Sequence, residues 1–179
     1  EVGAVVTKSM RLCPAEYYRA FEIRGDSIAV IGDDAASAVV YSEVGFAITA
    51  RGNNIYLARL HVIAQTLPSE AEHWLCLYDI CYFNSRLHQG GVAYGGGIWL
   101  QDGANATIVD SRIEGGAIGI ALQNRRGDRL IGNALTDLTG WGVFAQNVAD
   151  EFWIDNSIER INRACIGPDN RHYDSGCET

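Results

Sequence analysis

The sequence has little proline, almost no lysine and no long apolar run, and each absence narrows the choice of fold. Only 3 of the 179 residues are proline, whereas 20 are glycine, and Lys8 is the only lysine among 14 basic residues. Few helix-stopping prolines combined with many glycines are typical of a β protein with many turns. No stretch of about 18 consecutive apolar residues occurs, so we predict no helix that inserts into a membrane.

A deficit of positive charge restricts the classes of binding partner. The formal net charge is -8 at pH 7. Nucleic acids and anionic membranes are bound through Lys and Arg side chains that neutralise phosphates, so neither partner is predicted. An acidic polysaccharide would need a bridging cation or a local arginine patch. The 47% hydrophobic and 20% charged residues fit a globular protein, and the length fits a single domain over residues 1–179.

The cysteine spacing disfavours zinc and suggests one disulfide. None of the five cysteines belongs to a C-x-x-C pair, which structural zinc sites commonly use. Cys165 and Cys177 bracket a polar tail, and a disulfide between them would stabilise that end by about 2–4 kcal/mol. Disulfides persist in oxidising compartments, so we predict a secreted or extracytoplasmic protein. The alternative, in which all the cysteines are buried free thiols, stays open.

Three segments of the chain align with one another without gaps. They begin at Gly97, Gly119 and Gly142, which are 22 and 23 residues apart, and a further copy begins at Gly45. The aligned columns hold Gln101, Gln123 and Gln146; Asp102, Asn124 and Asn147; Ile108, Leu130 and Trp153; and Ile113, Leu135 and Ile158. The chain therefore contains an internal repeat, and the period of that repeat is the first guide to the fold.

Each repeat contains two short alternating apolar runs separated by a polar turn. Alternation with a period of two predicts β-strands. A unit of about 22 residues cannot bury its apolar side alone, so it must stack on its neighbours. Ser111, Asn133 and Asn156 follow the second run at the same sharp corner. Stacked in successive layers, their side chains could hydrogen-bond along the column.

The segments "LIGNAL" and "WIDNSI", together with "G-I-x-L", resemble the repeats of right-handed parallel β-helix proteins, which have the pectate-lyase-like fold. This resemblance implies an all-β, single-stranded right-handed parallel β-helix, a solenoid of about six to seven coils of ~22–25 residues. The coils would occupy residues 23–161, with 1–22 as an N-terminal cap or first coil and 162–179 as a C-terminal tail or cap. A leucine-rich repeat would show a helical half with several leucines, which these units lack.

The outward positions hold the candidate functional residues. We expect Arg59 and Arg112 to share one column, with His61 and Glu114 two positions further on. Asp110, Asp155 and Asp79 would share the position before the corner, and the aromatic side chains that project from the first strand are Trp99 and Phe144. Aspartate is also favoured at such corners for backbone reasons alone, and the arginine column could be an ordinary solvated face.

A saccharide groove is the functional interpretation of these columns. Carboxylates suit Ca²⁺, arginine pairs with a uronate, and an aromatic ring stacks on a sugar. In this interpretation the catalytic residues are Arg112, Arg59 and Asp110, the substrate contacts are His61, Glu114, Trp99 and Phe144, and the ligands of a Ca²⁺ ion are Asp79 and Asp110.

The resemblance implies a secreted carbohydrate-interacting protein, with lyase-like or epimerase-like action on an acidic polysaccharide. Lyase chemistry is favoured over hydrolysis because Asp33 and Asp34 lack the companion motifs of family hydrolases. A lyase motif, W-I-D-H, is matched from Trp153 onward except at Asn156. The alternative is a non-catalytic structural or adhesive solenoid, a filament, surface or tail-fibre subunit, that assembles by end-to-end or side-by-side stacking.

The tripeptide Arg-Gly-Asp occurs twice and is familiar as a cell-adhesion signal. It spans residues 24–26 and 126–128, and Arg-Gly-Asn at 51–53 takes the same place before an apolar strand residue. A turn accepts either Asp or Asn at the third position, whereas an adhesion receptor would not. We therefore interpret the tripeptide as a corner of the repeating coil.

Overall fold

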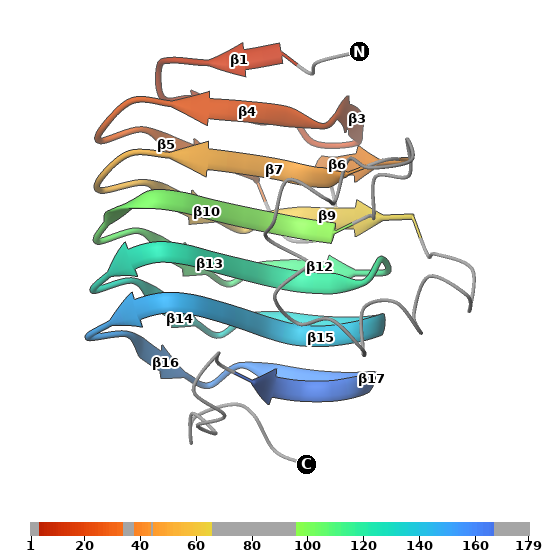
Figure 1. Cartoon of the computed structure of the whole chain (residues 1–179). Coiled ribbons are helices and arrows are strands. Elements are labelled where there is room, and N and C mark those ends of the chain that lie inside the picture. The colour runs from red at the N-terminus through yellow and green to blue at the C-terminus, as the bar shows by residue number, and fades with distance from the viewer. Residues whose placement is uncertain (1–3, 34–37, 44, 66–95, 167–179) are drawn as a thin grey trace, which may run out of the picture.

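The chain folds as an all-β parallel solenoid of about five turns with three parallel sheets (Figure 1). The computed structural model describes residues 4–33, 38–43, 45–65 and 96–166. Every strand pairing in these ranges is parallel, as stacking of repeated units requires. The described ranges contain no helix, and so no helix long and apolar enough to cross a membrane. The handedness of the coil and the full number of coils stay predictions.

Each turn contributes one strand to each of three sheets, which we name by their position in Figure 1. The front sheet contains β1 (Ala4–Val6), β4 (Phe21–Arg24), β7 (Phe46–Arg51), β10 (Gly96–Ala104), β13 (Ile118–Arg126) and the second half of β15 (Ala134–Ala149). The back sheet contains β2 (Met10–Arg11), β5 (Ala29–Ile31), β8 (Tyr56–Ala58), β11 (Thr107–Val109), β14 (Arg129–Ile131) and β16 (Phe152–Ile154). The side sheet contains β3 (Glu16–Arg19), β6 (Ala38–Ser42), β9 (His61–Ala64), β12 (Arg112–Glu114) and the first half of β15, and β17 (Ser157–Ile166) pairs along β15.

The core is a stack of aliphatic columns inside the coil. Leu57, Ile108, Leu130 and Trp153 are consecutive partners in the back sheet and are all 5% exposed or less. Burying each of these side chains contributes roughly 1.5–3 kcal/mol. The aligned columns of the sequence are confirmed, since β11, β14 and β16 pair in the predicted register. Residues 4–19 form β1, β2 and β3, which are strands of the first turn rather than a helical cap.

A buried amide ladder connects the layers at the corner between the back and side sheets. Asn133 is 1% exposed, and its amide donates to Ile108 O and to Asn156 Oδ1, each at 2.9 Å. Its Oδ1 accepts the Ser111 backbone N–H at 3.1 Å. The sequence prediction of hydrogen bonds along this column is therefore confirmed.

We expect Asn133→Ala to lower the free energy of unfolding by about 2–3 kcal/mol, because buried backbone groups lose their only side-chain partner. Gln123→Ala is the matched control. Gln123 belongs to a half-buried amide ladder in which it donates to Gln146 at 3.0 Å, and its loss should cost less than about 1 kcal/mol. Urea denaturation of both variants measures the difference. Equal destabilisation would contradict a special role for the buried ladder.

Candidate functional site

His61, Arg112 and Glu114 form a charged cluster on the outer surface of the side sheet. Val62 and Ile113 point into the core, so their neighbours in β9 and β12 point outward. Arg112 lies directly opposite His61 in the strand register, and Glu114 is one pleat further along. His61 Nε2 is 2.7 Å from Glu114 Oε1, while Arg112 Nε is 2.9 Å from Glu114 Oε2. The carboxylate therefore joins the two basic side chains, one through each oxygen.

The hydrogen bonds define the protonation state of the cluster. Burial raises the pKa of Glu114, but the hydrogen bonds from His61 and Arg112 outweigh it, so the pKa lies below its ordinary value. An ionised carboxylate accepts and cannot donate, so His61 Nε2 carries the proton of this hydrogen bond. In the neutral imidazole the lone pair is then on Nδ1, which is buried and has no hydrogen-bond partner. This is the arrangement of an oriented histidine base.

A second ion pair continues the charged surface towards the last turn. Arg160 of β17 donates to both oxygens of Asp137 in β15, at 2.6 and 2.8 Å. These hydrogen bonds lower the pKa of Asp137, burial opposes them slightly, and the charge of Arg112 lowers it further. Arg112 is 53% exposed on its side chain, so N–H groups that are not used by Glu114 remain available to an anion. The side sheet thus offers an exposed cation next to a held imidazole.

The predicted alignment of Arg59 with Arg112 is wrong. His61 is the residue opposite Arg112, whereas Arg59 belongs to the corner after β8, in one column with Asp110, Gly132 and Asp155. These four residues have φ values between 49° and 61°, a conformation that favours Gly, Asn and Asp. The backbone therefore accounts for the two aspartates of this column. The expected neighbours His61 and Glu114 do meet, across strands.

The described residues do not fit a bound Ca²⁺ ion. No group of three or more His, Cys, Asp or Glu side chains in the described ranges is close enough to hold a metal. Asp110 is flanked in its column by Arg59 and Gly132, not by carboxylates, and a Ca²⁺ site needs several oxygen ligands. Asp79 lies outside the described residues, so the predicted pair of calcium ligands stays a prediction.

The aromatic candidates lie on the front sheet and not beside the charged cluster. Trp99, Ala121 and Phe144 are consecutive partners in one outward column. Phe144 is 3% exposed and packs edge-on against Trp141, with ring centroids 5.4 Å apart. Trp99 is half-buried and contacts Phe46 at 5.2 Å. Both candidates belong to an aromatic cluster outside the coil, and Trp99 retains the more accessible ring.

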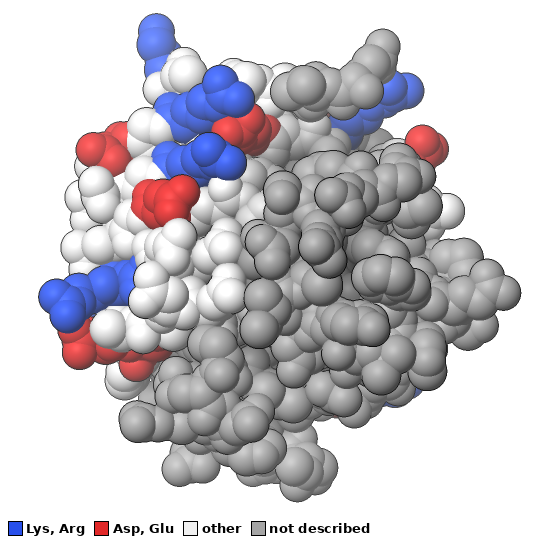
Figure 2. Space-filling view, in the orientation of Figure 1, with Lys and Arg blue, Asp and Glu red and all other residues white. Residues whose placement is uncertain are grey.

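An arginine pair on the front sheet was missed by the sequence reasoning. Arg24 and Arg51 are direct partners in β4 and β7, and Glu22 accepts a hydrogen bond from Arg24 at 2.7 Å. That bond lowers the pKa of Glu22, burial opposes it, and the charges of both arginines add to it. Figure 2 shows basic and acidic side chains side by side on this face. The repeated Arg-Gly dipeptide was the signal that could have identified the pair.

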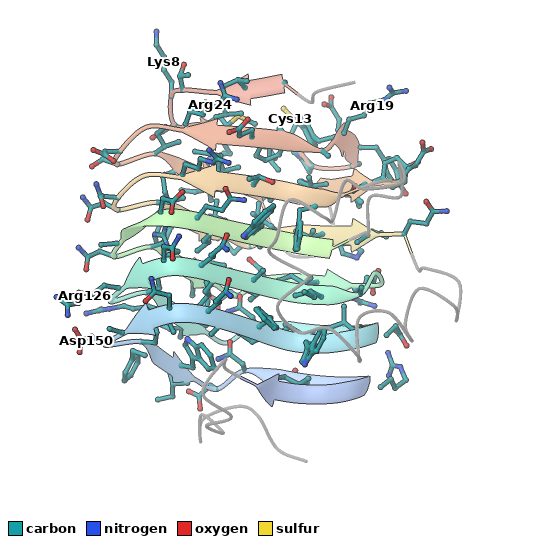
Figure 3. The ribbon with its side chains drawn as sticks, in the orientation of Figure 1. Lys8, Cys13, Arg19, Arg24, Arg126 and Asp150 are labelled. Carbon is teal, nitrogen blue, oxygen red and sulfur yellow. The ribbon has the colours of Figure 1, made fainter. Side chains whose placement is uncertain are left out.

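The prediction that the Arg-Gly-Asp tripeptides mark one repeating corner is wrong, because Arg24 shares a column with Gln101 and Gln123, three residues before Arg126. Asp26 is exposed and accepts the Asn53 backbone N–H at 2.7 Å, one layer away. Asp128 is 0% exposed and forms an ion pair with Arg125, which is also buried inside the coil. Arg126 points away from the coil near Asp150, 3.1 Å apart (Figure 3). A buried carboxylate cannot be presented to a receptor, so the second tripeptide serves the fold.

The predicted disulfide is not tested, because Cys177 lies outside the described residues. Cys13 is exposed and is a free thiol.

Comparison with known proteins gives only distant likenesses of structure. No protein family matches the chain, and no curated protein matches it. A crystal structure of a "putative glycosyl hydrolase" from Parabacteroides merdae ATCC 43184 is similar with a TM-score of 0.49 and 11% sequence identity, covering 93% of this chain and 84% of that chain. At this identity the likeness concerns the fold, and it carries no argument about activity.

Proposed function

We propose that the protein is an extracytoplasmic, right-handed β-helix that binds an acidic polysaccharide on its side sheet and acts on it by proton abstraction. The observation that carries this proposal is the cluster of His61, Glu114 and Arg112, in which a carboxylate holds an imidazole beside an exposed guanidinium. An acidic polymer needs local positive charge on a chain of net charge -8, and Arg112 supplies it at this position.

The chemistry follows from what each group can do. A lyase and an epimerase of uronates begin with the same step, removal of the proton from the carbon next to the carboxylate. His61 Nδ1 would accept this proton, with Glu114 holding the ring and stabilising the imidazolium that forms. The free N–H groups of Arg112 would stabilise the negative charge that develops on the substrate carboxylate. Departure of the leaving group at the adjacent carbon completes elimination, and reprotonation from the opposite face completes epimerisation.

Access to the base sets a condition on this mechanism. His61 is only 14% exposed on its side chain, and Nδ1 itself is buried. The proposal therefore requires the imidazole or its neighbours to move when the saccharide binds. Catalytic hydrogen bonds commonly reach their final geometry only in the substrate complex.

We expect His61→Gln to lower turnover of the responsive polymer by roughly 100-fold or more, because the general base is lost. Arg112→Ala should also lower turnover and should weaken binding. Arg24→Ala is the matched control, since it removes an exposed arginine from the front sheet. A panel of uronate polymers is assayed for binding by calorimetry and for product by the absorbance of unsaturated uronate or by NMR of the epimer. If no polymer is bound or changed, the proposed function is wrong.

A second candidate is a non-catalytic structural or adhesive solenoid that assembles with copies of itself. Exposed apolar side chains on the back sheet, Tyr56, Phe152 and Ile154, favour it. Wild-type turnover on any polymer that disappears in His61→Gln would exclude a purely structural role.

A further inference from the structure

The outer surface of the back sheet carries two columns of side chains that the proposed function does not use. We call this surface the back-sheet face. One column holds Ala29, Tyr56, Thr107, Arg129 and Phe152, and the other holds Ile31, Ala58, Val109, Ile131 and Ile154. The residues between the columns, including Leu57 and Leu130, point into the core. The second column is entirely aliphatic although it faces outward.

The exposure of this face is unusual for a sheet surface of the described chain. Tyr56, Phe152 and Ile154 are 40%, 52% and 37% exposed, and they make up three of the five exposed large hydrophobic residues in the described ranges. Ala58 is small and only 3% exposed, so no side chain projects between Ile31 and Val109. Exposed apolar side chains gathered on one face are typical of a protein interface, and the polar residues among them are Thr107 and the exposed Arg129.

We propose that the back-sheet face packs against the same face of a second copy, with a twofold axis parallel to the strands and midway between β11 and β14. Rotation about this axis reverses the order in which the layers of the second copy are stacked. Each residue keeps its position along the direction of the strands. The layer of β8 then faces that of β16 in the second copy, and β11 faces β14. A closed twofold pair of this kind is the commonest form of homo-oligomer.

The side chains complement one another in this register. Tyr56 meets Phe152 of the second copy, and the small Ala58 meets the projecting Ile154 of the second copy. By symmetry each contact occurs twice. The two aromatic residues are the most exposed apolar side chains in their column, so this pairing covers apolar surface that is costly to leave in water.

The charges at the corner support the same register. Arg59 follows β8 and Asp155 follows β16, so the twofold axis places Arg59 opposite Asp155 of the second copy, again twice. Arg59 has a φ of 52° in a column whose neighbours are Asp110 and Gly132, so the backbone does not explain an arginine there. Moving the axis by half a layer, onto β11, would place Asp110 opposite its own copy, which is repulsive.

The size of the face predicts a weak dimer. The four layers that overlap in this register, β8, β11, β14 and β16, at ~4.8 Å each and with strands of three residues and their corners, give a footprint of roughly 300 Å² per copy. Stable complexes bury about 800 Å² per partner. The dimer should therefore form in the micromolar to millimolar range and not at high dilution.

Sedimentation velocity from about 1 µM to about 1 mM, the range expected for a small interface, tests the proposal. A reducing agent is present because Cys13 is an exposed thiol. We expect a concentration-dependent dimer whose dissociation constant rises at least ~10-fold in Arg59→Asp and in Asp155→Arg, and returns close to the wild-type value in the double variant. The double variant recovers because both ion pairs re-form with their charges exchanged. Tyr17→Ser, which changes a residue 79% exposed in β3 of the side sheet, should leave dimerisation unchanged.

Two results would overturn the proposal. One is a monomer at every concentration. The other is a dimer that ignores both single charge reversals, or that the double variant fails to restore, while circular dichroism shows wild-type folding. Phe152→Ser is a second variant that leaves the corner backbone untouched. It should also weaken the dimer at least ~10-fold, because the contact buries the part of the Phe152 ring that is exposed in the monomer. Failure of the dimer does not bear on the His61 cluster, which lies on another sheet.

Discussion

Replacing Asp128 by alanine is expected to lower the free energy of unfolding by about 3–5 kcal/mol, because it leaves a buried guanidinium without its counter-ion. Arg125 Nε is 2.5 Å from Asp128 Oδ2, and both side chains are 0% exposed. The remaining polar contacts of Arg125 are neutral carbonyl groups, Gln101 O at 3.1 Å and Gly52 O at 3.3 Å. These cannot replace a negative charge, so water, local unfolding or ionisation of the nearby Glu151 must compensate the cation.

Asp128 also satisfies the backbone at this corner. Its Oδ1 accepts the Ala106 backbone N–H at 2.8 Å, which would be left unpaired in the variant. Gly103 belongs to the same arrangement, because a Cβ there would collide with Gly52 O and would come within 2.9 Å of Arg125 Nη1. The ion pair, the glycine and the carbonyl groups thus form one connected unit. Urea denaturation with fitted slopes measures the expected loss and checks that unfolding remains two-state.

Asp26→Ala is the matched control, because it changes the same tripeptide at an exposed corner. Asp26 accepts hydrogen bonds from the Asn53 backbone N–H and amide at 2.7 and 3.2 Å, and their loss at the surface should cost about 0.5–1.5 kcal/mol. An Arg125→Met/Asp128→Ala double variant should recover more than half of the loss, because an apolar pair replaces a buried ionic pair at little cost. Equal destabilisation by Asp26→Ala and Asp128→Ala would contradict the role assigned to burial.

These two aspartates also show what the sequence could not provide. The repeat predicted stacked parallel strands, because a unit of this length with period-two alternation can bury its apolar side only against copies of itself. The amide ladder was predictable because Asn133 and Asn156 recur at one corner. The shared tripeptide did not predict the burial of Asp128. The strand register separates the two sites, because Asp128 lies in the inward column of Ile28, Ile55 and Ala106, whereas Asp26 lies two residues before that column.

The alignment of Arg59 failed for a reason that alternation cannot detect. The turn after β7 is one residue shorter than the turn after β10, which accounts for a shift of one residue, whereas the predicted pairing of Arg59 with Arg112 lies two residues from the true pairing of His61 with Arg112. A slip of two residues keeps every side chain on its own face, whereas a slip of one would have moved His61 into the core. The sequence also could not show which columns share a sheet, so Trp99 and Phe144 were grouped with the side-sheet cluster. Which columns lie on the same sheet depends on the angle through which the chain turns at each corner.

Glu151 should make the stability of the protein fall as the pH rises. It occupies the inward position one layer beyond Asp128, and neither of its carboxylate oxygens has a hydrogen bond of good geometry. Burial, assisted by the charges of Asp128 and Asp150, raises the pKa of Glu151 to about 8. The Asp128 backbone amide and the charge of Arg125 oppose the shift. The folded protein therefore holds a proton at neutral pH that the unfolded chain has already released.

The direction of the effect follows from this difference in bound protons. Below about pH 4.5, the ordinary pKa of a glutamate, both states are protonated and the contribution of Glu151 is complete. Between there and the folded pKa of about 8, only the folded state keeps the proton, so the free energy of unfolding decreases with each pH unit. A pKa shift of this size corresponds to several kcal/mol in the free energy of unfolding. Because Glu151 is partly exposed, solvent screening reduces the expected change to about 2 kcal/mol.

Glu151→Gln isolates this contribution because the amide has nearly the same shape and does not titrate. The variant should match the wild type within about 0.5 kcal/mol at pH 5 and exceed its free energy of unfolding by about 2 kcal/mol at pH 9. Urea denaturation at both pH values gives the difference directly, and contributions from other groups cancel between the two proteins. A wild type that is as stable as the variant at pH 9 would mean that the folded chain ionises Glu151 without cost, by moving it into water or by shifting charge from Asp128. In the Asp128→Ala background the pH-dependent difference should shrink, because Glu151 loses the repulsion of Asp128 and remains the carboxylate next to Arg125.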